Sequence, residues 1–270
     1  MIFRPEGNFT NRPTRISFNV PSITSSEHAE PLHFIFSEHK TPDELYTALR
    51  NLFVKANGEE TGTLLDNAYK LAKEHHDKAP NKIRDDGRDY IFHPLEISYH
   101  IARLGFTDKV IILAALFHDL LEDTEVSKEE IVERLGKKLI SKEEFDLVMK
   151  IVNDLTEDTS YRKQNLEYKE DSQSKFKLAD GETCKGRLAT KIEHLSRVAN
   201  KGIEQSTILK VVDRIHNLLT NEAVSIEKQR RMEVKEIEAW RKFLDLRREV
   251  IPESLITLIT PLLDKEYKVI

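Results

Sequence analysis

The amino-acid sequence predicts an all-α protein: one helical bundle over residues 41–270, preceded by a short extended or β-containing arm over residues 1–40. From residue 41 onward, apolar residues recur three and four positions apart, which is the period of an amphipathic helix. No alternation of strands with helices is visible along this part. Before it, prolines separate two short alternating pieces, "RISFNV" and "LHFIF", which are typical of strands or extended arms.

Start and stop signals delimit the helices of the first half. Thr41 is a predicted N-cap that proline and two acids follow. The third helix has proline near its start and stops at Gly105, and the fourth is apolar all round, which favours a central position. Ser127 opens the fifth with a capping box, and the sixth repeats that pattern. The expected helices are 41–53, 63–76, 93–105, 107–124, 127–136 and 141–156.

The second half begins with a polar, weakly periodic segment over residues 157–187, which we interpret as an insertion or lid. Helical periodicity then returns in three stretches, 188–202, 204–223 and 227–250. The middle stretch is apolar, whereas the last is rich in charge pairs that suit a solvated helix.

Composition indicates a soluble globular protein. Of 270 residues, 39% are hydrophobic and 33% charged, unlike a disordered chain. No apolar run approaches the roughly 18–20 residues of a membrane span, and no signal peptide is visible. With a single cysteine, Cys184, we expect a cytoplasmic protein that does not bind membranes. A net charge of −5 disfavours DNA, so a phosphorylated ligand needs a local basic pocket or a metal.

The apolar helix over 107–124 ends with a cluster of ionisable residues in "FHDLLEDT". His118 and Glu122 are four positions apart, as are Asp119 and Asp123, so each pair is expected to lie one turn apart. Clustered carboxylates in a partly dry place repel one another unless one binds a proton or a cation. The alternative is a solvated helix end with ordinary surface acids.

Two further segments favour a metal site. His93 opens the helix over 93–105, and Asp213 lies inside the apolar helix over 204–223, with Arg214 and Asn217 beside it. An internal ion pair between Asp213 and Arg214 would satisfy both groups. A set of two histidines and two aspartates would instead suit Mn²⁺, Fe²⁺ or Zn²⁺ and leave positions for water and substrate.

These segments together resemble a known family. The stretch from Arg84 to Pro94, "RDDGRDYIFHP", then "AALFHDLLEDT" and "LKVVDRIHNL", are similar to the hydrolase domain of the RelA/SpoT homologues and the stand-alone small alarmone hydrolases. These proteins belong to the HD superfamily of metal-dependent phosphohydrolases. The order and spacing match from about Leu65 to Thr220, interrupted by 157–187.

The resemblance implies an HD-domain helical bundle that removes pyrophosphate from the 3′ position of (p)ppGpp, giving GDP or GTP. It implies one Mn²⁺ per chain, with Fe²⁺ or Zn²⁺ left open, and a catalytic pair formed by Glu122 and Asp123. Arg84 matches a residue that contacts the guanine base, and Arg214 is a candidate to neutralise phosphate charge. The implied metal ligands are His93, His118, Asp119 and Asp213, and the implied nucleotide-site residues include Lys210 and Asn217.

Several alternatives stay open at this point. Asp85 after Arg84 and Leu219 near the end of the motif depart from the family at the substrate rim. The substrate could therefore be (p)ppApp, a pyrophosphorylated RNA 3′ end or a nucleotide phosphomonoester, or the chain could be a regulatory binder. We expect degradation and not synthesis, because too few residues follow Asn217 for a synthetase domain. A homo-oligomer and a cognate alarmone synthetase, to which this chain would be an antitoxin, are both compatible with the sequence.

Overall fold

The computed structural model describes residues 41–135, 139–157, 175–177, 181, 183–222 and 234–268. The predicted arm over 1–40 lies outside the described residues, and so does most of the predicted insertion over 157–187. Within the part that is described, the body is all-α, as the sequence predicts, with one small pair of strands. No helix of the described residues is long and apolar enough to cross a membrane.

The helices follow the predicted order. The elements of the first half are α1 (Pro42–Asn57), the 3₁₀ helix η1 (Glu59–Thr61), α2 (Gly62–Lys78), α3 (Phe92–Arg103), α4 (Lys109–Phe117), α5 (Leu120–Asp123), α6 (Lys128–Leu135) and α7 (Lys142–Leu155). Those of the second half are β1 (Lys175–Lys177), β2 (Thr183–Lys185), α9 (Gly186–Lys201), α10 (Glu204–Glu222), α11 (Val234–Leu246) and α12 (Glu253–Lys268).

The predicted N-caps are present. The Thr41 side chain accepts a hydrogen bond from the Glu44 amide, and the Glu44 carboxylate accepts one from the Thr41 amide. The same reciprocal pair forms between Ser141 and Glu144 at the start of α7. These boxes satisfy amides that the first turn of a helix leaves unpaired.

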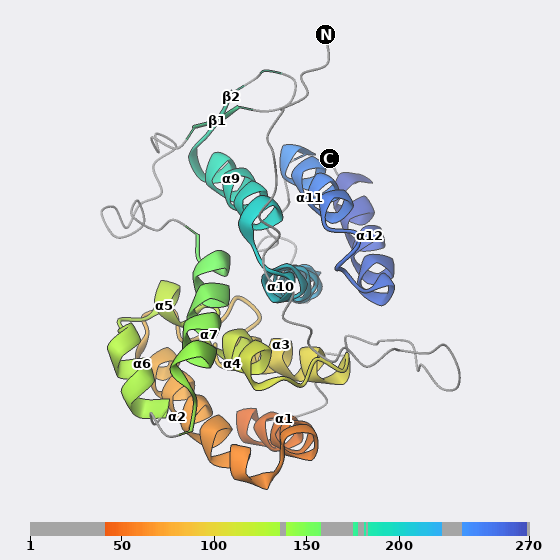
Figure 1. Ribbon diagram of the computed structural model, residues 1–270. Coiled ribbons are helices and arrows are strands. Elements are labelled where there is room, and N and C mark those ends of the chain that lie inside the picture. Colours follow the sequence, from red (N-terminus) through yellow and green to blue (C-terminus); the bar gives the residue numbers. More distant parts are fainter. Residues whose placement is uncertain are drawn as a thin grey trace.

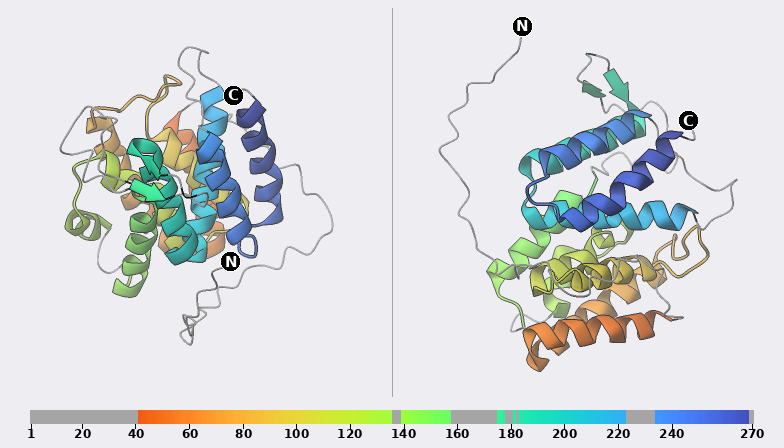
Figure 2. Two further views of the ribbon diagram at one scale, coloured as in Figure 1. Left: turned by 90° about the horizontal axis from the view of Figure 1, so that it is seen from above. Right: turned by 90° about the vertical axis from the view of Figure 1, so that its right-hand side faces the viewer.

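The helices stack in layers around α3, α4 and α10 (Figures 1 and 2). Helix α3 packs between α1 on one side and α10 on the other, and α4 packs against both α3 and α7. Beyond α10 lie α9, α11 and α12. Residues 110–117 of α4 are all buried, which agrees with the central position predicted from its all-round apolar pattern. The three central helices are also the ones that carry the candidate site.

One predicted helix is divided in two. The stretch 107–124 was expected to be continuous, but α4 ends at Phe117 and the short α5 begins at Leu120. Asp119 between them has φ −98° and ψ −6°, at the edge of the right-handed helical region. The His118 ring contacts the backbone carbonyl of Ala115, so this side chain makes a local bond at the helix end. The break directs His118 and Asp119 toward the same cavity.

The strands were not predicted. β1 and β2 pair antiparallel with Phe176 opposite Cys184, inside the segment interpreted as a polar insertion. Gly181 between them has φ +88°, a conformation that glycine adopts without strain. Cys184 is buried against Ala189 and Ile192 of α9. Each strand has three residues, too few for a period-two pattern to stand out in the sequence.

The core can be tested at α4. Replacing Leu113, which is fully buried, with alanine is expected to lower the free energy of unfolding by about 2–5 kcal/mol, because a cavity remains after the side chain is shortened. Leu246 on α11 is 54% exposed, and the same replacement there should change stability by less than about 0.5 kcal/mol. Urea unfolding followed by circular dichroism measures both. Equal losses at the two positions would contradict a core centred on α4.

Candidate metal centre

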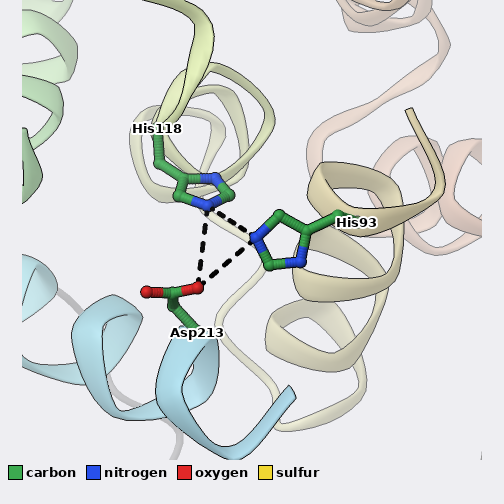
Figure 3. A group of neighbouring side chains, drawn as sticks. All are labelled: His93, His118 and Asp213. Carbon is green, nitrogen blue, oxygen red and sulfur yellow. Dashed lines mark hydrogen bonds and ion pairs between the residues drawn. The ribbon is translucent and has the colours of Figure 1, made fainter. Parts of the chain in front are cut away.

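Three helices bring two histidines and an aspartate together (Figure 3). His93 lies in the first turn of α3, His118 follows α4, and Asp213 lies in the middle of α10. The two Nε2 atoms are 3.2 Å apart, and Asp213 Oδ1 is 3.4 Å from Nε2 of His93 and 3.9 Å from Nε2 of His118. These ligand atoms all lie within 4.8 Å of one another.

Asp119 closes the cluster on the remaining side. Its Oδ2 is 3.3 Å from His93 Nε2, and its Oδ1 is 3.3 Å from His118 Nε2. Two donors bound about 2.1 Å from one ion, at tetrahedral or octahedral angles, are about 3.0–3.4 Å apart. The donor set of two imidazoles and two carboxylates therefore has both the chemistry and the spacing of a divalent-cation site. The structure brings together all four residues that the sequence predicts as ligands.

The electrostatics of the cluster call for a positive charge. Burial alone would lower the pKa of His118, but the adjacent carboxylates of Asp119 and Asp213 outweigh it and raise the pKa to about 9. Burial would raise the pKa of both aspartates, yet His93 and His118 hold these pKa values below the usual range. The carboxylates thus stay ionised, and a cation among them replaces a proton.

The ring of His118 is oriented for coordination. Its Nδ1 lies 2.7 Å from the carbonyl oxygen of Ala115, which can only accept a hydrogen bond. The ring therefore carries its proton on Nδ1 when neutral and presents the lone pair of Nε2 to the cluster. The His118 side chain is 3% exposed, so water does not compete for this bond.

The two predicted catalytic acids occupy different positions. Glu122 lines a cavity of about 150 Å³ together with His93, His118, Asp119 and Asp213, and its carboxylate accepts a hydrogen bond from the Glu157 amide at 3.4 Å. Asp123 lies on the side of a larger cleft of about 430 Å³. Glu122 thus shares a cavity with all four predicted ligands, whereas Asp123 shares the larger cleft with Asp213 alone among them.

The Tyr90 hydroxyl bridges Asp119 and Asp123, a role that the sequence analysis did not assign. Its hydroxyl lies 2.8 Å from Asp119 Oδ2 and 2.6 Å from Asp123 Oδ2, so these carboxylates are side by side as the spacing predicts. Burial and the two aspartates raise the pKa of Tyr90 well above its usual value, and the phenol keeps the proton that it donates. The ring stacks on buried His76 with centroids 4.8 Å apart.

The predicted nucleotide-site residues lie around the ligands. Arg84 Nη2 donates to Asn217 Oδ1 at 3.0 Å, and Asn217 Nδ2 donates to Asp213 Oδ1 at 2.7 Å. Lys210 Nζ is 3.8 Å from Asp213 Oδ2. Asn217 therefore links a ligand to Arg84, and all three polar side chains line the cavity that holds the ligand atoms.

Arg214 faces a different partner from the one considered in the sequence analysis. Its Nη2 donates to the buried carboxylate of Glu236 at 3.1 Å, and its guanidinium lies over the Trp240 ring, 5.6 Å from the centroid. Lys191 binds the same carboxylate at 2.9 Å. Arg214 thus makes an internal ion pair, but with Glu236 of α11 and not with Asp213, and it also lines the larger cleft.

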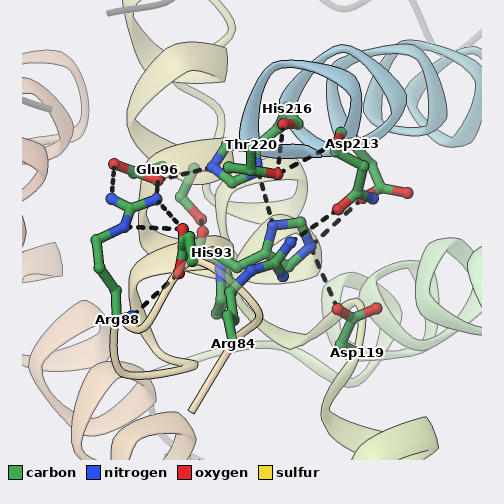
Figure 4. Close-up of polar contacts among 12 residues, drawn as sticks. Arg84, Arg88, His93, Glu96, Asp119, Asp213, His216 and Thr220 are labelled. Atoms are coloured by element: carbon green, nitrogen blue, oxygen red, sulfur yellow. Dashed lines mark hydrogen bonds and ion pairs between the residues drawn. The ribbon is translucent and has the colours of Figure 1, made fainter. Parts of the chain in front are cut away.

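Beyond the ligands lies a second group of polar residues that the sequence analysis missed: Arg88, Glu96 and His216 (Figure 4). Glu96 is 1% exposed and His216 is 4% exposed. The sequence spacing could have indicated two of them, because Glu96 follows His93 by three residues and His216 follows Asp213 by three residues. Residues three apart share a helix face, so both face the same interior as the ligands.

The fold and the site define an all-α protein with a buried histidine–aspartate centre that is suited to a divalent cation. Residues 68–243 match the family described as the HD domain, which is more than half of the 270-residue chain. The chain belongs to the HD domain family.

The relatives of this chain include proteins named as pyrophosphohydrolases and proteins named as pyrophosphokinases. Guanosine-3′,5′-bis(diphosphate) 3′-pyrophosphohydrolase of Aquifex aeolicus is 44% identical over 75 residues, or 28% of this chain and 10% of that protein. A protein of the same name from Spiroplasma citri is 28% identical over 181 residues, covering 66% and 19%. A probable GTP pyrophosphokinase of Mycobacterium leprae is 29% identical over 169 residues, covering 63% and 17%. The match thus spans less than a fifth of each relative.

One structural match is to a chain described under the words "A metazoan ortholog of SpoT hydrolyzes ppGpp and plays a role in starvation responses". It has a TM-score of 0.48 and 20% sequence identity, and it covers 76% of this chain and 94% of that chain.

Proposed function

We propose that this chain is a metal-dependent hydrolase that removes the 3′-pyrophosphate from (p)ppGpp-like alarmone nucleotides, giving GDP or GTP and pyrophosphate. The observation that carries the proposal is the convergence of His93, His118, Asp119 and Asp213 on one point beside Glu122. Relatives named for this reaction, one of them 44% identical over 75 residues, support the substrate class.

A divalent cation held by the four ligands, Mn²⁺ in this proposal, would polarise a phosphate oxygen and lower the pKa of a bound water. Glu122 shares the cavity with the ligands and is placed to orient that water or to exchange a proton with it. The Tyr90 hydroxyl contacts both Asp119 and Asp123, donates its single proton to one of them at a time, and holds Asp123 in register with the ligands. Such fixed geometry lowers the entropic cost of reaching the transition state.

The cleft beside the centre has room for a nucleotide and brings cationic side chains to it, and acids such as Asp85, Asp86 and Glu157 line it as well. It measures about 430 Å³, and its lining includes Arg84, Lys210 and Arg214 as well as the indole of Trp240. Guanidinium and ammonium groups neutralise phosphate oxygens, which a chain of net charge −5 must do locally. Asp85 lies on the same lining beside Arg84, and this rim is where our proposal locates the choice of base.

The direct test is a substrate panel. The purified chain is incubated with Mn²⁺ and, separately, with ppGpp, pppGpp, ppApp, a pyrophosphorylated RNA 3′ end and a nucleoside monophosphate, and the products are separated by chromatography. Release of pyrophosphate from the guanosine substrates supports the proposal. Release of orthophosphate alone would indicate a phosphomonoesterase, and a chain that binds Mn²⁺ but turns over none of them would be a binder. Parallel reactions with Fe²⁺ and Zn²⁺ identify the metal.

Arg84 is expected to act in substrate binding. Replacing it with alanine should raise KM by about 10- to 100-fold and change kcat less, because a charge-assisted hydrogen bond contributes about 1.5–3 kcal/mol. Arg103→Ala is the matched control, since Arg103 is an exposed arginine at the end of α3, packed over Tyr99. Steady-state kinetics measure both. A fall in kcat larger than the rise in KM would mean that Arg84 acts through Asn217 on Asp213.

A further inference from the structure

A continuous chain of polar contacts, half-buried at Arg88 and buried from Glu96 onward, runs from Arg88 to the metal ligand His93 (Figure 4). Arg88 donates to both oxygens of Glu96, from Nη1 at 2.7 Å and from Nη2 at 3.1 Å. Glu96 Oε2 lies 2.7 Å from Nε2 of His216. Nδ1 of His216 lies 3.0 Å from Nδ1 of His93. Glu96, His216 and His93 come from two helices, α3 and α10, that pack against each other.

Each contact in this chain restricts where the next hydrogen lies. A guanidinium only donates, so both Glu96 oxygens accept and the carboxylate carries no proton of its own. Nε2 of His216 must therefore donate to Glu96. A neutral His216 then has a lone pair on Nδ1, and that atom accepts the proton of His93 Nδ1. His93 is left with a lone pair on Nε2, the atom that faces Asp119 and Asp213.

We propose that Arg88, Glu96 and His216 are positioning residues that lock His93 in the tautomer and ring orientation required to coordinate the cation. This inference rests on the metal centre proposed above. Outer partners of this kind fix a ligand histidine and raise its basicity. We call this chain of contacts from Arg88 through Glu96 and His216 to His93 the lock. Burial strengthens it, because Glu96 is 1% exposed and water has little access to compete for its oxygens.

The two ligand histidines are thus oriented in different ways. His118 uses a backbone carbonyl, that of Ala115, which no substitution removes. His93 depends on side chains, and the last of them, Arg88, belongs to the loop between α2 and α3. Arg88 is itself held by Asp86, and its backbone carbonyl accepts the Arg84 amide at 2.9 Å. The lock therefore joins the metal ligand to the loop that carries Arg84 and Tyr90.

The first test is cation affinity. The chelator-treated full chain is titrated with Mn²⁺ and free ion is followed by electron paramagnetic resonance. Glu96→Gln should weaken Mn²⁺ binding by about 10- to 100-fold. Asp66→Asn is the control. Asp66 of α2 contacts Arg50 and Tyr46 of α1, so the replacement alters a carboxylate contact elsewhere in the protein. It should leave the Mn²⁺ affinity unchanged. Equal affinity for Glu96→Gln and the wild type would overturn the lock.

A graded pair at position 216 separates positioning from packing. His216→Asn keeps an amide oxygen that can accept from His93 Nδ1, whereas His216→Leu keeps volume and offers no acceptor. We expect His216→Leu to lose more Mn²⁺ affinity than His216→Asn, by about tenfold or more. Equal affinities of the two variants would contradict the lock. A wild type that binds none of Mn²⁺, Fe²⁺ and Zn²⁺ would instead overturn the metal centre.

The second test needs no variant. Long-range ¹H–¹⁵N spectra of the zinc-loaded wild-type chain report which ring nitrogen carries each proton. The lock requires a proton on Nδ1 of His93 and on Nε2 of His216. A proton on Nδ1 of His216 would overturn it, even where the substituted chains fail to fold.

Discussion

Replacing Asp119 with alanine is expected to abolish both metal binding and turnover. Each carboxylate oxygen of Asp119 lies 3.3 Å from the Nε2 atom of one ligand histidine, so the replacement removes one of the two carboxylates in the predicted ligand set. We expect bound Mn²⁺ to fall from about one per chain to near zero after dialysis, and kcat/KM to fall by at least about 10³-fold. Metal analysis and pyrophosphate release measure the two losses.

The chain supplies its own control, because it holds a second His–Asp dipeptide. Asp77 follows His76 at the end of α2, is 48% exposed at its side chain and pairs with Lys73 one turn away. Asp77→Ala should leave metal content and turnover unchanged. Full metal retention in Asp119→Ala would limit the ligand set to His93, His118 and Asp213, whose atoms already form a compact group.

The comparison of the two His–Asp dipeptides shows which part of the candidate site could be predicted from the sequence. The dipeptide alone could not distinguish Asp77 from Asp119, whereas the apolar helix before His118 could, because a buried helix places its last residues inside the protein. Elements with strong caps or strong periodicity, such as the helices that begin after Thr41 and Ser141, were predicted within a few residues. Their start is fixed by local hydrogen bonds that sequence shows directly.

Features that leave no mark on the local sequence pattern were missed. The break between α4 and α5 interrupts no visible pattern, because both pieces continue the same apolar run. Tyr90 lies in the loop before α3, where no period indicates which way a side chain points. The partners of Glu96 are 8 and 120 residues away, and only folding brings them together. The candidate ligands, which short motifs mark in the sequence, were therefore easier to predict than the residues that orient them.

The second large effect is expected at Glu122. Replacing it with glutamine should leave Mn²⁺ bound and lower kcat by about 10²–10⁴-fold, because the amide cannot exchange a proton with the attacking water or the leaving oxygen. Glu122 shares the cavity of the ligands, and its carboxylate accepts a hydrogen bond from the Glu157 amide. Glu125→Gln, at an exposed position just beyond α5, is the matched control and should retain full activity.

Asp123 provides an internal comparison for the same step. Its Oδ2 accepts from Tyr90, so Asp123→Asn mainly disturbs the link to Asp119 and should cost kcat less than Glu122→Gln. Metal analysis and single-turnover rates, measured on both variants at saturating Mn²⁺, separate loss of the ion from loss of proton transfer. If Glu122→Gln releases the metal, Glu122 belongs to the coordination sphere. If Asp123→Asn has the larger kinetic effect, the acid that handles the proton is the one held by Tyr90, and chemistry takes place on the side of the larger cleft.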